Sequence, residues 1–203
     1  VRTLFDFYAQ DFEDKLVGKL NYQAPNLLRD LLLGYDGLDF SEKNLHLLDL
    51  GCGTGLFGDV FQHYVKVMDG VDLSPAMLAK AETKKIYRQL VADDITHYMM
   101  DKKHCYHLIV AADVFVYLGD LEPVLTACRH AIIAPGAIAF SVEKAPDDIT
   151  YRLMGSGRYE HGKNYLLDIA QQTGFNVEKI TEVTLRMNAG KPVIGYVVLL
   201  VAN

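Results

Sequence analysis

The sequence predicts an α/β protein with a seven-stranded, mostly parallel sheet that ends in an antiparallel C-terminal hairpin. Between residues 45 and 143, short apolar runs alternate with amphipathic helical runs. Such alternation requires parallel strands joined by right-handed crossovers, with helices on both faces. The first apolar run leads into a turn with alternating glycines, 51–55. The last two apolar runs are joined by a short glycine-containing segment, 188–191, which predicts a β-hairpin.

Residues 1–33 have the spacing of two amphipathic helices. In the first helix, apolar residues recur at three- and four-residue steps from Leu4 to Leu20. Pro25 suits the first turn of the second helix, because its missing N–H is not needed there. Residues 34–44 then predict a loop.

The central alternation predicts five strands and four helices. The strands are expected near residues 45–50, 66–72, 86–91, 106–112 and 135–143. The helices are expected near residues 55–64, 75–85, 94–101 and 120–132. Ser74 is a candidate cap for the second of these helices, with Pro75 in its first turn.

The pattern loosens after residue 143. Residues 144–160 contain glycines and charged residues but few aliphatic ones, so we expect a loop, with at most one helical turn. A helix is expected at 161–172, followed by two long strands at 175–187 and 192–202.

Composition limits the classes of function. The chain has 203 residues, of which 50% are hydrophobic and 23% charged, which is ordinary for one soluble globular domain. A net charge of −6 argues against a nucleic-acid partner, whose phosphates require a basic surface. No apolar stretch reaches the roughly 18–20 residues of a membrane span, and charged residues interrupt any secretory signal. We therefore expect a cytoplasmic protein that binds neither nucleic acid nor membrane.

The cysteines and histidines do not indicate a metal site or disulfides. The three cysteines, Cys52, Cys105 and Cys128, are odd in number and widely spaced. In the run 104–107 (HCYH), the two strand faces would separate the possible ligands. We expect no metal.

The stretch 47–58 (LLDLGCGTGLFG) predicts a ligand site. A strand, a glycine turn and a helix start direct free backbone N–H groups at a ligand, and glycine lets that ligand approach closely. Asp72 ends the next apolar run. An acid about 20 residues past such a turn is placed to bind both ribose hydroxyls. The sequence therefore predicts a nucleoside-binding site.

At these residues the chain resembles the class I S-adenosylmethionine-dependent methyltransferases. Four stretches carry the resemblance in the family's order: Asp49 with Gly51, Gly53 and Gly55; Val71–Leu78; Ala92–Ile95; and Ala112–Leu118. A narrower likeness runs from Phe5–Ala9 and Tyr22–Pro25 to Gly157–His161 with Tyr165. It is to predicted small-molecule methyltransferases that are often linked to tetratricopeptide repeats, although no such 34-residue repeat is visible here. Because the sequence starts at Val1, an upstream domain is one expected partner, and a homodimer is another.

The resemblance implies a three-layer Rossmann-like methyltransferase fold in a single domain, 1–203. Within it, residues 1–44 would form a helical lid over the cofactor or, alternatively, simply cover the sheet. Residues 45–143 would form the cofactor-binding half, and 144–203 the substrate side with its loop, helix and hairpin. The cofactor would be S-adenosyl-L-methionine, the product S-adenosyl-L-homocysteine, and the substrate a small molecule methylated by in-line displacement.

The shape of this cofactor suggests a role for each motif residue. Backbone at Gly51, Cys52, Gly53 and Gly55 would pass under the methionine moiety and ribose, with Cys52 as small packing. Asp49 would face the sulfonium or amino group, Asp72 the ribose, and Asp113 the reacting centre. Asp93 or Asp94 would accept from the adenine amino group, the other capping the next helix, and Ile95 would offer its N–H. Leu73 and Met77 would enclose the adenine, with a plain core role as the alternative for Met77.

The acceptor side is less defined. His161 is the candidate general base, because its unperturbed pKa suits proton removal; alternatively it caps a helix or orients Tyr165. Tyr8 is the candidate lid residue. Tyr117 and Tyr165 would contact substrate. Three arginines could bind an anionic acceptor or, alternatively, form surface ion pairs; they are Arg152, Arg158 and Arg186.

Two other interpretations compete. Gly53, Gly55 and Gly58 fit the G-x-G-x-x-G dinucleotide pattern, but the first glycine after the strand is Gly51, which puts Leu56 where the third glycine would be. The predicted C-terminal hairpin also disagrees with a dinucleotide fold. The second alternative is a catalytically silent cofactor-binding or scaffold domain.

Overall fold

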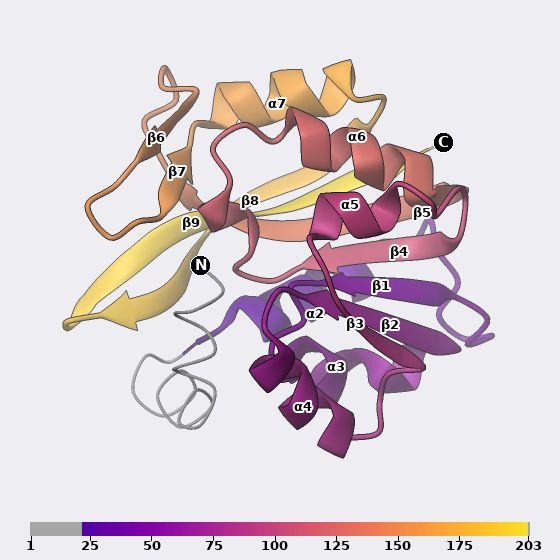
Figure 1. Cartoon of the computed structure of the whole chain (residues 1–203). Coiled ribbons are helices and arrows are strands. Elements are labelled where there is room, and N and C mark those ends of the chain that lie inside the picture. The colour runs from indigo at the N-terminus through magenta and orange to yellow at the C-terminus, as the bar shows by residue number, and fades with distance from the viewer. Residues whose placement is uncertain (1–21, 203) are drawn as a thin grey trace.

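The computed structural model describes residues 22–202, and it contains one mixed sheet between two layers of helices (Figure 1). Five strands form its parallel part in the order β3-β2-β1-β4-β5. They are β1 (His46–Leu50), β2 (Val67–Asp72), β3 (Gln89–Ala92), β4 (Tyr106–Ala111) and β5 (Ile132–Lys144). The expected parallel alternation is confirmed.

The C-terminal strands are antiparallel, as the short glycine-containing connection predicted. β9 (Lys191–Ala202) pairs antiparallel with β5 over eight residue pairs, and β8 (Asn176–Asn188) pairs antiparallel with β9. The last strand of the chain therefore lies beside β5, in the interior of the sheet. This arrangement excludes the parallel second half of a dinucleotide fold.

The helices cover both faces of the sheet, as right-handed crossovers require (Figure 1). One layer contains α2 (Ala24–Leu33), α3 (Leu56–Phe61) and α4 (Pro75–Thr83). The other contains α5 (Ile95–Met99), α6 (Glu122–Ala131) and α7 (Lys163–Gln172). Two short 3₁₀ turns, η2 (Gln62–Tyr64) and η3 (Phe115–Tyr117), complete the element order.

Strand residues alternate between two apolar cores. On β1, Leu48 and Leu50 face the core under α5, α6 and α7, while Leu47 faces the core under α2 and α3. All three side chains are fully buried. A strand buried on both faces explains why this segment is a continuous apolar run rather than an alternating one.

The prediction of a loop at 144–160 is wrong in part. β6 (Tyr151–Leu153) and β7 (Tyr159–His161) form an antiparallel hairpin, and β7 pairs in parallel with the last two residues of β5. The sheet of the described residues therefore has nine strands, not the seven expected. At Glu143, β9 occupies the other side of β5, so the hairpin lies on the β4 side, past the end of β4. Three-residue strands are too short to show a period of two, so the sequence pattern could not reveal them.

The remaining boundaries differ from expectation by a few residues, within the usual uncertainty of helix and strand ends. Helix α7 begins at Lys163 rather than at residue 161, because His161 is the last residue of β7. The helix expected over residues 4–20, and Tyr8 with it, lies outside the described residues. Among residues 22–202, no helix combines the length and apolar character needed to cross a bilayer.

Candidate functional site

The glycine turn between β1 and α3 has a backbone that only glycine adopts without strain. Gly51, Gly53 and Gly55 have φ angles of 61°, 54° and 88°, all in the left-handed region. At Gly51 an added Cβ would also lie 2.4 Å from a methyl carbon of Val114, which follows β4. The turn is therefore held against the end of the neighbouring strand, and its spacing of glycines has a steric cause.

Asp72 lies against this turn. Its Oδ2 accepts a hydrogen bond from the Gly53 backbone N–H at 2.9 Å, and its Oδ1 accepts one from the Ser74 N–H at 2.8 Å. Ser74 in turn caps α4, accepting from the Met77 N–H, as predicted. The acid at the end of β2 is thus fixed beside the turn instead of pointing into bulk solvent.

Asp49 is the buried acid of the site. It is only 1% exposed, and its Oδ2 accepts a 2.7 Å hydrogen bond from the Tyr87 hydroxyl. Burial raises the pKa of Asp49 from 3.8 to about 7; the Tyr87 hydrogen bond lowers it, and the Asp72 charge raises it further. This carboxyl group would be stabilised in its ionised form by a nearby cation.

The turn contains one buried hydroxyl that has no partner among residues 22–202. Thr54 is 1% exposed, and its Oγ1 has no hydrogen-bond partner among the described residues. Buried polar groups are normally satisfied, and an exception commonly marks a place where a ligand or water binds. Cys52 is buried as well, and burial raises the pKa of its thiol, which suits packing and not a nucleophile.

The two aspartates after β3 have different positions. Asp94 caps α5, accepting from the N–H groups of Thr96 at 2.9 Å and His97 at 3.1 Å. Asp93 instead pairs with the His97 ring, with 2.7 Å between its Oδ2 and Nδ1, and this hydrogen bond lowers the pKa of Asp93. Since Asp94 is the helix cap, Asp93 is the better candidate for the adenine side. Ile95 is buried at the start of α5.

The two apolar residues expected around the adenine are placed differently. Leu73, directly after Asp72, is 37% exposed and is free to cover a ligand. Met77 is 1% exposed in the interior. Its side chain offers no accessible face, so its position is that of a core residue.

Four charged groups form a cluster at the ends of β4 and β5, which we call the charge quartet: Asp113, Glu143, Arg158 and Arg186. Arg158 Nη1 lies 2.9 and 3.0 Å from the two Asp113 oxygens and 3.2 Å from Glu143 Oε1. Arg186 Nη2 donates to Glu143 at 2.5 Å. Their side chains are 8–19% exposed. The quartet therefore balances two positive charges with two negative charges and joins the β6–β7 hairpin to the sheet.

Two tyrosines adjoin the quartet. Arg158 Nη2 donates to the Tyr117 hydroxyl oxygen at 2.9 Å, and the Tyr22 hydroxyl donates to the Ala112 carbonyl at 3.3 Å. Burial raises the pKa of both phenols, and for Tyr22 the charges of Asp113 and Asp49 raise it further. Both groups therefore stay protonated. From the sequence Tyr22 has no assigned role in the site, since it falls in the break between two predicted helices, although it begins the stretch Tyr22–Pro25 that carries part of the family resemblance.

The geometry argues against His161 as a general base. Its side chain is fully buried, its Nε2 donates to the Gly119 carbonyl at 3.0 Å, and its ring stacks on Tyr165. Burial lowers the pKa of His161 to about 4, so the ring is neutral. The predicted alternative, a role in orienting Tyr165, agrees better with these contacts; the Tyr165 hydroxyl accepts from the Leu121 N–H at 2.7 Å.

The arginines do not converge on an open anion site. Arg152 pairs with Glu160 across the β6–β7 hairpin, with 2.7 Å between Nη2 and Oε2. Arg158 and Arg186 already pair with carboxylates in the quartet. The expectation that these side chains bind an anionic acceptor is therefore not supported.

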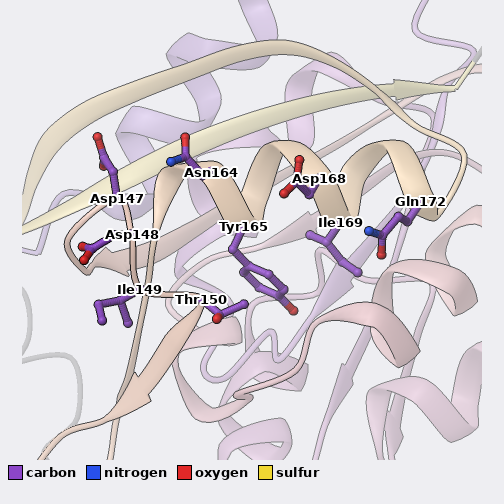
Figure 2. A pocket seen from close by; sticks show the side chains of 9 residues that line it. All are labelled: Asp147, Asp148, Ile149, Thr150, Asn164, Tyr165, Asp168, Ile169 and Gln172. Carbon is purple, nitrogen blue, oxygen red and sulfur yellow. The ribbon is translucent and has the colours of Figure 1, made fainter.

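A pocket of about 420 Å³ lies beside α7, between this helix and the segment before β6 (Figure 2). It is lined by side chains of α7 and of the segment before β6: Asp147, Asp148, Ile149, Thr150, Asn164, Tyr165, Asp168, Ile169 and Gln172. Of the described residues that the sequence predicted for the site, it contains Tyr165 alone. Neither the glycine turn nor Asp72 contributes to it.

The central part of the chain is similar to known methyltransferase domains. Residues 48–139, slightly less than half of the chain, match a family described as a methyltransferase domain. A ubiquinone biosynthesis O-methyltransferase from Pseudomonas savastanoi pv. phaseolicola is 24% identical over 118 residues, 54% of this chain and 50% of the relative. The chain thus spans about half the length of the curated relatives it matches.

Solved structures share the fold. A TehB-like SAM-dependent methyltransferase from Corynebacterium glutamicum superposes with a TM-score of 0.69 at 19% identity, covering 99% of both chains. Magnesium protoporphyrin IX methyltransferase from Synechocystis with bound SAH gives a TM-score of 0.66 at 14% identity, covering 89% of this chain and 82% of that one. The three-layer Rossmann-like methyltransferase fold is therefore established for residues 22–202.

Proposed function

We propose that this chain is an S-adenosylmethionine-dependent methyltransferase that transfers a methyl group to a small molecule. The observation that carries the proposal is the Asp72 carboxylate, held by the Gly53 and Ser74 N–H groups beside the left-handed glycine turn. The methyltransferase-domain match over residues 48–139 and the fold of the solved relatives support it.

In this proposal, residues 45–143 hold the cofactor. Asp72, at the end of β2 and beside the glycine turn, accepts hydrogen bonds from the ribose hydroxyls. Asp49 faces the positive charges of the methionine moiety. Burial raises the pKa of this carboxyl group, and a bound cation would lower it again by stabilising the ionised form. Asp93 and Leu73 bind on the adenine side. The buried, unpartnered Thr54 hydroxyl is a further candidate contact.

S-adenosylmethionine supplies an electrophilic methyl group and leaves as S-adenosylhomocysteine. The protein must mainly orient the acceptor and exclude water. We assign this task to the β6–β7 hairpin, which lies in residues 144–203, together with the end of β4 and the charge quartet. Tyr22 and Tyr117 act as neutral hydrogen-bond donors or acceptors there, because burial raises the pKa of both phenols.

The acceptor is proposed to be an uncharged small molecule. Arg158 and Arg186 are already neutralised by Asp113 and Glu143, so an anion would gain little from them. His161 is buried and is not assigned as a base. The name of the curated relatives, O-methyltransferases, makes hydroxyl compounds the first acceptors to test.

The test is a methyl-transfer assay with labelled S-adenosylmethionine and matched panels of phenols, amines, thiols and carboxylic acids. We expect turnover with an uncharged acceptor and none with its carboxylate analogue. Turnover that disappears in Asp72→Ala but persists in the surface variant Asp36→Ala would support the assigned site. Tight binding of the cofactor without turnover on any panel would contradict the enzyme and favour a silent binding domain.

A further inference from the structure

We infer that Tyr87 is a positioning residue of the cofactor site, which holds the Asp49 carboxylate in the orientation that the cofactor needs. This inference rests on the proposed function. Tyr87 lies in the connection between α4 and β3, outside every stretch that resembles a family motif. Its ring nevertheless reaches the centre of the site, because its hydroxyl donates to Asp49 Oδ2 at 2.7 Å.

Three glycines from three elements make room for the Tyr87 ring. An added Cβ at Gly70, in β2, would lie 3.1 Å from Tyr87 Cδ1, and nearer still to the Leu90 and Cys52 side chains. At Gly55, in the turn, the distance to Cε2 would be 3.1 Å, and at Gly58, in α3, the distance to the hydroxyl oxygen would be 2.7 Å. A Cβ atom at any of these positions would crowd the ring. The tyrosine therefore occupies a slot that the surrounding backbone leaves open for it.

The slot leads directly to Asp49. Gly70 is the register partner of Asp49 in the β1–β2 ladder, so the ring crosses β2 where no side chain stands in the way. A carboxylate on a strand has rotational freedom about its side-chain bonds, and a fixed donor removes much of it. The hydrogen bond also favours the ionised form of Asp49 and lowers its pKa against the effect of burial.

The groups around Asp49 give no compensating positive charge among the described residues. Asp72 at the end of β2 raises the pKa of Asp49. Cys52 in the turn and Tyr22 before α2 both sense the Asp49 charge, and each stays protonated because its own pKa is raised. The charge of Asp59, in α3, raises the pKa of Tyr87, so this phenol also stays protonated. Asp59 itself pairs with Lys84. Tyr87 is thus the neighbour that favours the ionised form of Asp49.

A pH-dependent affinity follows. The ionised carboxylate attracts the cofactor's positive charges, so affinity rises with pH through the pKa of Asp49, near 7. Removing the Tyr87 hydroxyl raises that pKa, and a shift of about one unit would leave roughly a fivefold smaller ionised fraction at pH 7. Above about pH 9, where Asp49 is ionised in both proteins, the difference in affinity should narrow to the part that orientation of the carboxylate alone contributes.

The experiment is calorimetric titration of S-adenosylmethionine from pH 5.5 to 9 into wild type, Tyr87→Phe, Asp49→Asn and the double variant. We expect Tyr87→Phe to bind about fivefold more weakly at pH 7, with its affinity midpoint about one pH unit higher. In the Asp49→Asn background, Tyr87→Phe should have little further effect on the affinity for S-adenosylmethionine. The Asp49→Asn variant also shows how much of the pH dependence comes from titration of the cofactor itself.

The matched control is Tyr64→Phe, which makes the same change at a tyrosine of η2 that packs on Phe61 of α3. It should leave the pH profile unchanged. An equal loss of affinity at all pH values, or an equal loss in the Asp49→Asn background, would overturn the positioning role. Absence of binding by the wild type at every pH would instead refute the proposed function itself.

Discussion

Asp49→Asn should stabilise the free protein at high pH. The substitution keeps the shape of the side chain and an oxygen that accepts from Tyr87, but it removes a carboxylate that is 1% exposed. Burial raises the pKa of Asp49 from 3.8 to about 7, so the folded state binds this proton more tightly than the unfolded state does. Between these two values, stability falls as pH rises.

The magnitude follows from linkage. With pKa values of 3.8 unfolded and about 7 folded, the wild type should lose about 3 kcal/mol of unfolding free energy between pH 5 and pH 8 through this group. Asp49→Asn lacks this loss. Its stability advantage over wild type should therefore be about 3 kcal/mol larger at pH 8 than at pH 5.

Urea unfolding at both pH values measures this difference directly. The control is Asp36→Asn, at an exposed loop position, where the variant and wild type should respond alike. An Asp49→Asn advantage that does not grow from pH 5 to pH 8 would refute the assignment of a raised pKa. The same variant should bind S-adenosylmethionine more weakly, the usual exchange of stability for function at a binding site.

Three further predictions concern the turn, the quartet and the buried histidine. Gly51→Ala should destabilise the fold by about 1–3 kcal/mol, measured by urea unfolding, because φ is 61° and the new Cβ meets Val114; a neutral effect would contradict the turn geometry. Arg158→Met leaves Asp113 without its main partner and should cost about 3–5 kcal/mol, whereas the exposed control Arg152→Met should cost less than about 1 kcal/mol; equal effects would contradict a buried quartet. His161→Gln should lower thermal stability but leave the pH profile of turnover unchanged; loss of the acidic limb of that profile would restore the histidine as a base.

The fold could be predicted largely from the sequence because its central strands are buried on both faces. That burial makes β1, β2 and β4 rich in apolar residues on both faces, and the turn residues between them are equally distinct. The β6–β7 hairpin could not be predicted, since strands of three residues depend on pairing with a distant β5 rather than on their own pattern.

The candidate site divides in the same way. The glycines and Asp72 follow each other closely along the chain, so their spacing indicated them, and the family resemblance indicated Asp49. Tyr22 and Tyr87 reach the site only through tertiary contacts. One local signal was present, because an isolated glycine inside a strand, here Gly70, indicates a close approach by another group. The pairing of the arginines with Asp113 and Glu143 has no counterpart in sequence spacing.

The central claim is that the acid after β2 holds the sugar of a sulfonium nucleoside beside the glycine turn. Calorimetric titration of S-adenosylhomocysteine into wild type and Asp72→Ala, with Asp36→Ala as the control, tests it most directly. We predict binding to wild type and to the control, and a loss of at least about 100-fold in Asp72→Ala, because two hydrogen bonds to a carboxylate disappear. Equal affinity of Asp72→Ala and wild type would contradict the account.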